Sequence, residues 1–142
     1  MKVPDLNLLI YAVDSEAPHH QAALDWWNAS LSGTESIGLA WSVLLGFVRL
    51  TTSPLVVRSP MTPAASLDYL DRWLARDVTT VVEPTPRHVA LLRDLLAESG
   101  TAGNLVADAH LAALAIEHGA QLCSADRDFG RFPGLRWSNP LA

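Results

Sequence analysis

The segment Val3–Ala12 of this 142-residue chain reads VPDLNLLIYA. Val3 and Pro4 are typical of a short strand, and the apolar residues of Leu6–Ala12 recur at helical spacing. Asp5 therefore lies at the seam between a strand and a helix. In a parallel α/β sheet such seams line the carboxyl edge of the strands, where ligands bind. The segment predicts an α/β fold with its functional site at that edge.

Strand-like runs and helical patterns alternate along the rest of the chain, which predicts a parallel sheet with helices on both faces. We expect one domain over residues 1–142, a three-layer α/β/α sandwich around a mainly parallel sheet of four to five strands. The further expected strands are Ser36–Ala40, Val78–Val82, Ala120–Ser124 and Leu135–Trp137. The further expected helices are His19–Leu31 after Pro18, Ser42–Leu50, Pro63–Leu74, Pro86–Glu98 and Leu105–His118, with a turn or short helix at Asp126–Phe132.

Capping signals refine these helices. Thr62 before Pro63 and Thr85 before Pro86 have the residue types of an N-cap followed by the first helical residue. Asn104 is a third candidate N-cap, after a turn at Ser99–Gly103, and Gly33 and Gly119 predict helix ends. The helix Pro63–Leu74 is expected to present Leu67, Leu70, Trp73 and Leu74 as one apolar stripe.

Composition limits the classes of protein. The chain is 49% hydrophobic with a net charge of −5, which suits a globular core and argues against a general nucleic-acid coat protein. No apolar run reaches the ~20 residues of a membrane span. The start, Met1–Asp5, lacks the apolar region of a signal peptide, so we expect a cytoplasmic protein and leave secretion open. Cys123 is the only cysteine and is expected in the core.

Acidic residues recur at the predicted seams. Asp5 follows the first strand, and Asp126 follows the strand Ala120–Ser124 by two residues, with Asp128 beside it. Two like charges about 4 Å apart cost roughly 4 kcal/mol at an effective dielectric near 20. If these carboxylates converge, either some are protonated or a divalent cation lies among them. Oxygen-only ligands favour Mg²⁺ or Mn²⁺ over Zn²⁺.

The position of Asp108 supports the hypothesis of a bound cation. It shares one helix face with Leu111, Ala112 and Ala115, at the spacing i, i+3, i+4 and i+7. This face is otherwise apolar and should pack on the sheet, where a carboxylate without a partner is costly. Asp108 is therefore the strongest single candidate for a metal ligand.

Simpler interpretations stay open for several residues. Asp5 could cap the first helix, and Asp126 and Asp128 could be turn residues. Trp41 could stack on a base or belong to the core or to a dimer interface. The five histidines show no spacing typical of a zinc site and are expected to be structural or surface residues: His19, His20, His88, His110 and His118.

Three motifs together resemble a known family. Asp5–Ala12 looks like the opening motif of PIN-domain ribonucleases, Gly103–Ala115 like their third acidic motif, and Ser124–Phe129 like the closing one. Their order and spacing, and the length of the chain, resemble the VapC toxins of bacterial toxin–antitoxin pairs. The resemblance implies a PIN-like fold, a Mg²⁺-dependent endoribonuclease in which Mn²⁺ can substitute, a homodimer and a cognate VapB antitoxin.

The resemblance also assigns residues. Asp5 and Asp108 match the core metal ligands, and Asp126 matches the fourth acidic position, with Asp128 as a further catalytic candidate. Three polar residues are candidates to support this cluster: Asn7, Ser124 and Asn104. Three arginines are candidates to contact RNA phosphates, although ordinary surface pairing explains them equally well: Arg49, Arg127 and Arg131.

One position departs from the family. The glutamate usually found in the helix after the second strand is replaced by Gly46, and no other carboxylate lies between Glu35 and Asp68. Either water or Asp128 completes the metal shell, or the protein is catalytically weak. The rival interpretations are a PIN-like module that binds RNA or protein without cleaving, and a metal-dependent DNA nuclease.

Overall fold

A five-stranded parallel sheet lies at the centre of the molecule. The computed structural model describes residues 1–97, 103 and 105–142. The strand order is β3-β2-β1-β4-β5, and every neighbouring pair is parallel. The strands are short: β1 (Lys2–Pro4), β2 (Ile37–Ala40), β3 (Thr79–Val82), β4 (Gln121–Cys123) and β5 (Trp137–Ser138). The expected parallel α/β architecture is confirmed.

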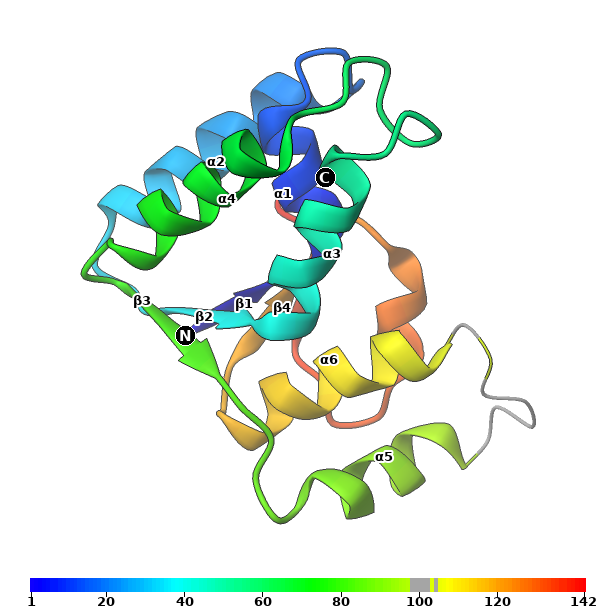
Figure 1. The fold of residues 1–142 in the computed structure, drawn as a ribbon. Helices are drawn as coiled ribbons and strands as arrows, with labels where there is room; N and C mark the ends of the chain where they lie inside the picture. The colour runs from blue at the N-terminus through cyan, green and yellow to red at the C-terminus, as the bar shows by residue number, and fades with distance from the viewer. Residues whose placement is uncertain (98–102, 104) are drawn as a thin grey trace.

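Helices connect successive strands and cover the sheet. In Figure 1, α2 and α4 lie on one side of the strands, and α5 and α6 lie on the other. Such crossovers are what parallel strands require, because a tight turn cannot join two parallel neighbours. The helices are α1 (Leu6–Val13), α2 (His20–Ser32), α3 (Trp41–Thr51), α4 (Pro63–Leu74), α5 (His88–Leu96) and α6 (Leu105–Glu117), with a 3₁₀ turn η1 (Arg127–Arg131).

The core on the α2 and α4 side is aromatic. Phe47 of α3 is fully buried and packs on Trp73 of α4, with ring centroids 4.8 Å apart. Trp27 of α2 meets the same Trp73 edge-on at 5.6 Å. Every residue of β2 is buried, so the sheet's second strand is covered on both faces. These aromatic rings fix α2, α3 and α4 to one another.

Some predicted helix starts are confirmed and others are wrong. Thr62 is the N-cap of α4, and its hydroxyl accepts a hydrogen bond from Ala65 N at 3.2 Å. Thr85 is not the N-cap of α5, which begins at His88 after the cap residue Arg87. The Thr85 hydroxyl accepts from Arg87 N at 3.2 Å in the turn before the helix and donates to the buried Glu117 at 2.6 Å. Pro18 is not the first residue of α2, because a turn closed by His20 N and Ala17 O precedes that helix.

Smaller differences follow from packing. Leu67 does not belong to the buried stripe of α4, since its side chain is 48% exposed. The last strand is Trp137–Ser138, one to two residues later than predicted, because Leu122 N bonds Arg136 O and sets the register. The predicted turn at Ser99–Gly103, the cap Asn104 and the helix end at Glu98 lie outside the described residues, apart from Gly103. No helix in the described part of the chain could cross a membrane.

Truncation of Phe47 tests this packing. We expect Phe47→Ala to lower the free energy of unfolding by about 3–5 kcal/mol, because it removes a buried ring from between two helices. Leu55→Ala is the control, since Leu55 is 95% exposed and its loss should cost no more than about 0.5 kcal/mol. Urea denaturation measures both values. A loss below about 1 kcal/mol for Phe47→Ala would contradict the aromatic core.

Candidate active site

The pairing of β1 with β4 creates the centre of the site. Pro4 is in register with Cys123, and Asp5 N donates a hydrogen bond to Cys123 O at 2.8 Å. The residues that follow the two strands, Asp5 and Ser124, therefore emerge side by side at the carboxyl edge of the sheet. They are 119 positions apart in the chain. Parallel pairing thus brings the first and last predicted motifs together.

Ser124 links three polar residues of this edge. Its hydroxyl donates to Asp5 Oδ2 at 2.7 Å and accepts from Asn7 Nδ2 at 3.3 Å and from Asp126 N at 3.0 Å. The Ser124 side chain is fully buried. All three capacities of the hydroxyl, one donor and two acceptors, are therefore used. Ser124 holds Asp5 and the start of the Asp126 turn in fixed positions.

Asp5 caps a helix and also faces the cluster. Its Oδ1 accepts from Leu6 N at 2.7 Å, so it is the N-cap of α1, while Oδ2 is held by Ser124. Burial raises the pKa of Asp5 above its ordinary value, and the nearby Asp126 raises it further, against the lowering effect of the two hydrogen bonds. The capping interpretation and the cluster interpretation are therefore both compatible with this geometry.

Asp108 is the most perturbed carboxylate. It lies in the first turn of α6 and is partly exposed. Its pKa is raised from 3.8 to about 6, chiefly by burial and also by the charges of Asp5, Asp126 and Asp128. Arg131 acts in the opposite direction. Asp5, Asp126 and Asp128, from two other segments of the chain, therefore lie near enough to Asp108 for their charges to raise its pKa.

Asp126 and Asp128 also make contacts outside the carboxylate cluster. Asp126 Oδ1 accepts from Asp128 N at 2.9 Å and caps η1, so Asp126 is also a turn residue. Asp128 is exposed and forms an ion pair with Arg131, with 3.7 Å between Oδ1 and Nη2. Arg127 and Arg49 are also exposed.

The oxygen atoms of this cluster are of the type that binds a hard divalent cation, although they do not surround a single position. Among the described residues, no group of three or more His, Cys, Asp or Glu side chains is arranged to hold a metal ion. The available ligands are nonetheless all oxygens, as Mg²⁺ and Mn²⁺ prefer. Asn7 Oδ1 is buried and has no hydrogen-bond partner, which is costly for an amide oxygen. Excess negative charge and an unsatisfied oxygen together fit a cation better than they fit an empty site.

Gly46 provides no ligand, and Leu6 packs directly against it. It is buried in α3, and a Cβ atom built there would lie 2.7 Å from Leu6 Cδ2. Leu6 thus fills the space into which a side chain at position 46 would extend. Within the described ranges, the acidic neighbours that raise the pKa of Asp108 are Asp5, Asp126 and Asp128. The structure offers no described carboxylate in place of the family's glutamate.

The sequence patterns did not indicate a second polar cluster, which lies around His88. His88 is buried and lies 2.8 Å from Glu117 and 2.9 Å from His110. The two histidines are 22 positions apart, on helices that pack antiparallel, so no local spacing could have indicated the pair. Trp41 had three candidate roles from the sequence: base stacking, the core or a dimer interface. It is 46% exposed and is therefore not a core residue.

Comparisons with known proteins agree with this fold and its motifs. The family model described as "PIN domain" matches residues 2–135. Ribonuclease VapC37 of Mycobacterium tuberculosis is 46% identical over 142 residues, which cover 100% of this chain and 99% of the relative. Ribonuclease VapC33 of the same species is 40% identical over 141 residues, with 99% of each chain covered.

Solved structures with lower sequence identity share the fold. VapBC2 from Rickettsia felis, bound to a DNA fragment from its promoter, matches with a TM-score of 0.71 at 19% identity and covers 97% of each chain. VapBC-1 from nontypeable Haemophilus influenzae matches with a TM-score of 0.71 at 16% identity, over 99% of this chain and 98% of that one. On the strength of the family model and the close relatives, this chain belongs to the PIN-domain family and, within it, to the VapC ribonucleases.

Proposed function

We propose that this chain, as a single PIN domain over residues 1–142, is the toxin of a VapBC-type pair and hydrolyses RNA phosphodiester bonds with Mg²⁺. The observation that carries the proposal is the proximity of Asp5, Asp108 and Asp126 at the carboxyl edge of the sheet, close enough that their charges help to raise the pKa values of Asp5 and Asp108. Relatives named VapC ribonucleases, identical at up to 46% of positions, support the activity. Mn²⁺ is expected to substitute, because it accepts the same oxygen ligands.

Asp5 and Asp108 would hold the cation, and Asp126 would complete its shell with water. When bound, the cation lowers the pKa of a water molecule and neutralises charge that develops on the phosphate oxygens. Ser124 keeps Asp5 Oδ2 oriented through the 2.7 Å hydrogen bond, so that carboxylate needs little reorganisation. Asn7 Oδ1 offers a further neutral oxygen.

Basic residues around the acidic cluster would bind the RNA phosphates. Arg131 acts on Asp108 and pairs with the exposed Asp128 at 3.7 Å, so it can exchange that carboxylate for a phosphate oxygen. Arg127 lies on the same turn, and Arg49 is exposed on α3. An exposed ion pair contributes little to stability, so its rearrangement is inexpensive.

The partners follow from the family and from the surface. Trp41 and Leu45 are separated by one turn of α3 and are 46% and 62% exposed, which suits a homodimer interface or a bound antitoxin helix. We expect a cognate VapB antitoxin to neutralise the enzyme. An antitoxin arginine that reached the acidic cluster would replace the cation's charge.

The second candidate is a PIN-like module that binds RNA or protein with little catalysis. The observation in its favour is Gly46, whose packing against Leu6 leaves no ligand at the family's glutamate position. Titration of Mn²⁺ against RNA cleavage separates the two candidates. Cleavage that rises with Mn²⁺ and is abolished by a chelator supports the nuclease, whereas RNA binding without cleavage at any Mn²⁺ concentration supports the module.

Asp108→Asn tests the assignment of the main ligand. We expect RNA cleavage to fall at least about 100-fold, because the amide cannot supply the negative charge that the cation requires. Asp68→Asn, an exposed change on α4, should leave cleavage unaltered. Circular dichroism should show both variants folded. Wild-type cleavage by folded Asp108→Asn would remove Asp108 from the mechanism.

The raised pKa of Asp108 predicts a pH-dependent stability. The folded protein retains this proton up to about pH 6, whereas the unfolded chain releases it near 3.8. The free energy of unfolding of the metal-free protein should therefore fall as pH rises through this range, with the full loss above about pH 6. Asp108→Asn should remove this contribution and be more stable than wild type at pH 7.5 by about 1 kcal/mol, after allowance for solvent screening.

Thermal or urea denaturation between pH 4.5 and 7.5, with a chelator present, measures this difference. Asp5 contributes in the same direction in both proteins, so the gap between the two curves reports Asp108. Saturating Mg²⁺ should narrow the gap at pH 7.5, since the cation stabilises the charged carboxylate. Parallel curves for the two proteins would contradict the raised pKa.

A further inference from the structure

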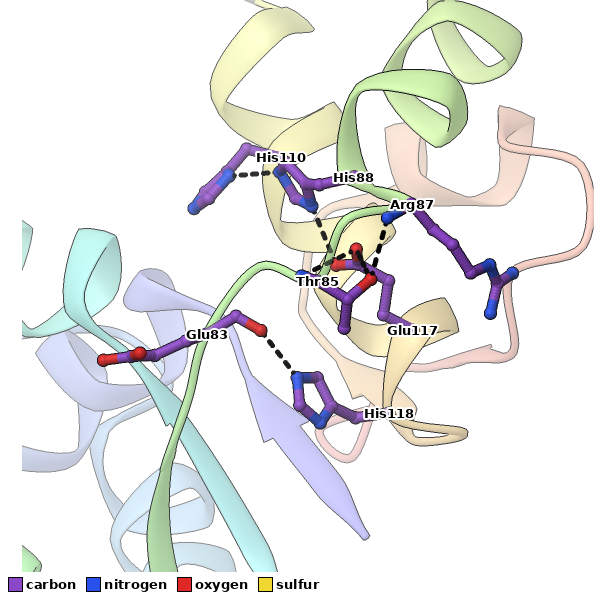
Figure 2. Close-up of polar contacts among 7 residues, drawn as sticks. All are labelled: Glu83, Thr85, Arg87, His88, His110, Glu117 and His118. Atoms are coloured by element: carbon purple, nitrogen blue, oxygen red, sulfur yellow. Dashed lines mark hydrogen bonds and ion pairs between the residues drawn. The ribbon is translucent and has the colours of Figure 1, made fainter.

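Two histidines meet between α5 and α6, away from the oxygen cluster. His88 is the first residue of α5 and its side chain is 10% exposed. Its Nδ1 lies 2.8 Å from Glu117 Oε2, and its Nε2 lies 2.9 Å from His110 Nδ1. Figure 2 shows the chain of contacts from Thr85 through Glu117 and His88 to His110. Thr85 precedes α5 and His88 begins it, whereas His110 lies within α6 and Glu117 ends it.

Glu117 is a buried anion without a permanent positive partner. Its side chain is fully buried, and among the described residues only His88 lies within ion-pair distance of it. Burial alone would raise the pKa of Glu117, but hydrogen bonds from Thr85 and His88 lower it, so the carboxylate is ionised. It is also the last residue of α6, where the helix dipole disfavours negative charge. The environment therefore favours an additional cation nearby.

The hydrogen bonds fix the tautomer of His88 and bring its Nε2 next to His110. A carboxylate only accepts, so His88 Nδ1 carries the proton, and in the neutral ring His88 Nε2 accepts the hydrogen bond from His110 Nδ1. An ion bound between the two rings would replace that shared proton, with His110 then protonated on Nε2. The contact of Glu117 with His88 is the carboxylate–histidine arrangement that supports metal-bound imidazoles. Glu117 is in turn fixed by Thr85, whose N and Oγ1 donate to Oε1 at 3.1 and 2.6 Å.

The separation of the ring nitrogens is close to that of two ligands of one ion. Two nitrogens bound to zinc at about 2.0–2.1 Å lie roughly 3.0–3.4 Å apart. The observed 2.9 Å between His88 Nε2 and His110 Nδ1 needs only a small rotation of the more exposed ring, His110. The ring planes are inclined at 77°, so the two imidazoles meet edge to face and do not stack.

We propose that His88 and His110 form a binding site for a borderline-soft divalent ion such as Zn²⁺, with Glu117 and Thr85 as its outer support and water as the remaining ligands. The site is chemically distinct from the oxygen cluster, which selects hard ions. Its ion links α5 to α6, the helix that carries Asp108, and so stabilises the element on which the oxygen cluster depends.

Calorimetric titration of Zn²⁺ into untagged protein tests the proposal. Asp108→Asn serves as the background and excess Mg²⁺ is present, so that zinc does not fill the oxygen cluster. We expect one Zn²⁺ per chain. His110→Ala should weaken binding at least about tenfold, and Glu117→Gln by about 10–100-fold, as loss of an outer partner typically does. His110 is the preferred change because it is more exposed than His88.

His118→Ala and His19→Ala are the matched controls, since both histidines are exposed and lie outside the pair. They should bind Zn²⁺ as the background protein does. Zinc should also raise the melting temperature of the background protein and not that of His110→Ala. Absence of zinc binding, or equal binding by His110→Ala, would overturn the proposal and leave a hydrogen-bonded histidine pair only. Neither result depends on RNA cleavage, so the proposed nuclease function would stand or fall separately.

Discussion

Parallel pairing of β1 with β4 is the constraint on which the site depends. The two strands are only three residues long each, and their register places Asp5 beside Ser124. A shift of one residue would turn the wrong side chains toward the carboxyl edge, because successive residues of a strand face opposite sides. The hydrogen bonds of Ser124 then carry this register to Asp5, Asn7 and Asp126. Strand pairing therefore determines the electrostatics of the site.

Stability and function oppose each other at this edge. Asp108 could be neutral in the metal-free protein only below about pH 6, and above that pH its charge adds to those of Asp5 and Asp126. The rest of the fold must offset the free-energy cost of this repulsion. The aromatic packing of Phe47, Trp73 and Trp27 contributes to that. A cation would relieve the repulsion and use the same carboxylates for chemistry. Destabilised ionisable groups in a cleft are typical of functional sites for this reason.

Much of this arrangement could be predicted because its signals are local. Asp5 follows a strand directly, and Asp108 interrupts an apolar helix face, so both positions were indicated by neighbouring residues. Long-range contacts gave no such signal: Thr85 was expected only to cap a helix, but its hydroxyl also donates to a carboxylate 32 positions away. The packing of Gly46 against Leu6 likewise depends on how α1 and α3 meet. Sequence patterns locate the elements, and only their packing decides which polar groups become partners.

The most direct test of the account is the position of a bound Mn²⁺ ion, located by its anomalous scattering in crystals of the protein grown with MnCl₂ at about pH 7.5. The account predicts a peak within coordination distance of both Asp5 and Asp108, with Asp126 or water completing the shell at about 2.0–2.3 Å. A crystal saturated with Mn²⁺ that shows no peak between Asp5 and Asp108 would contradict it.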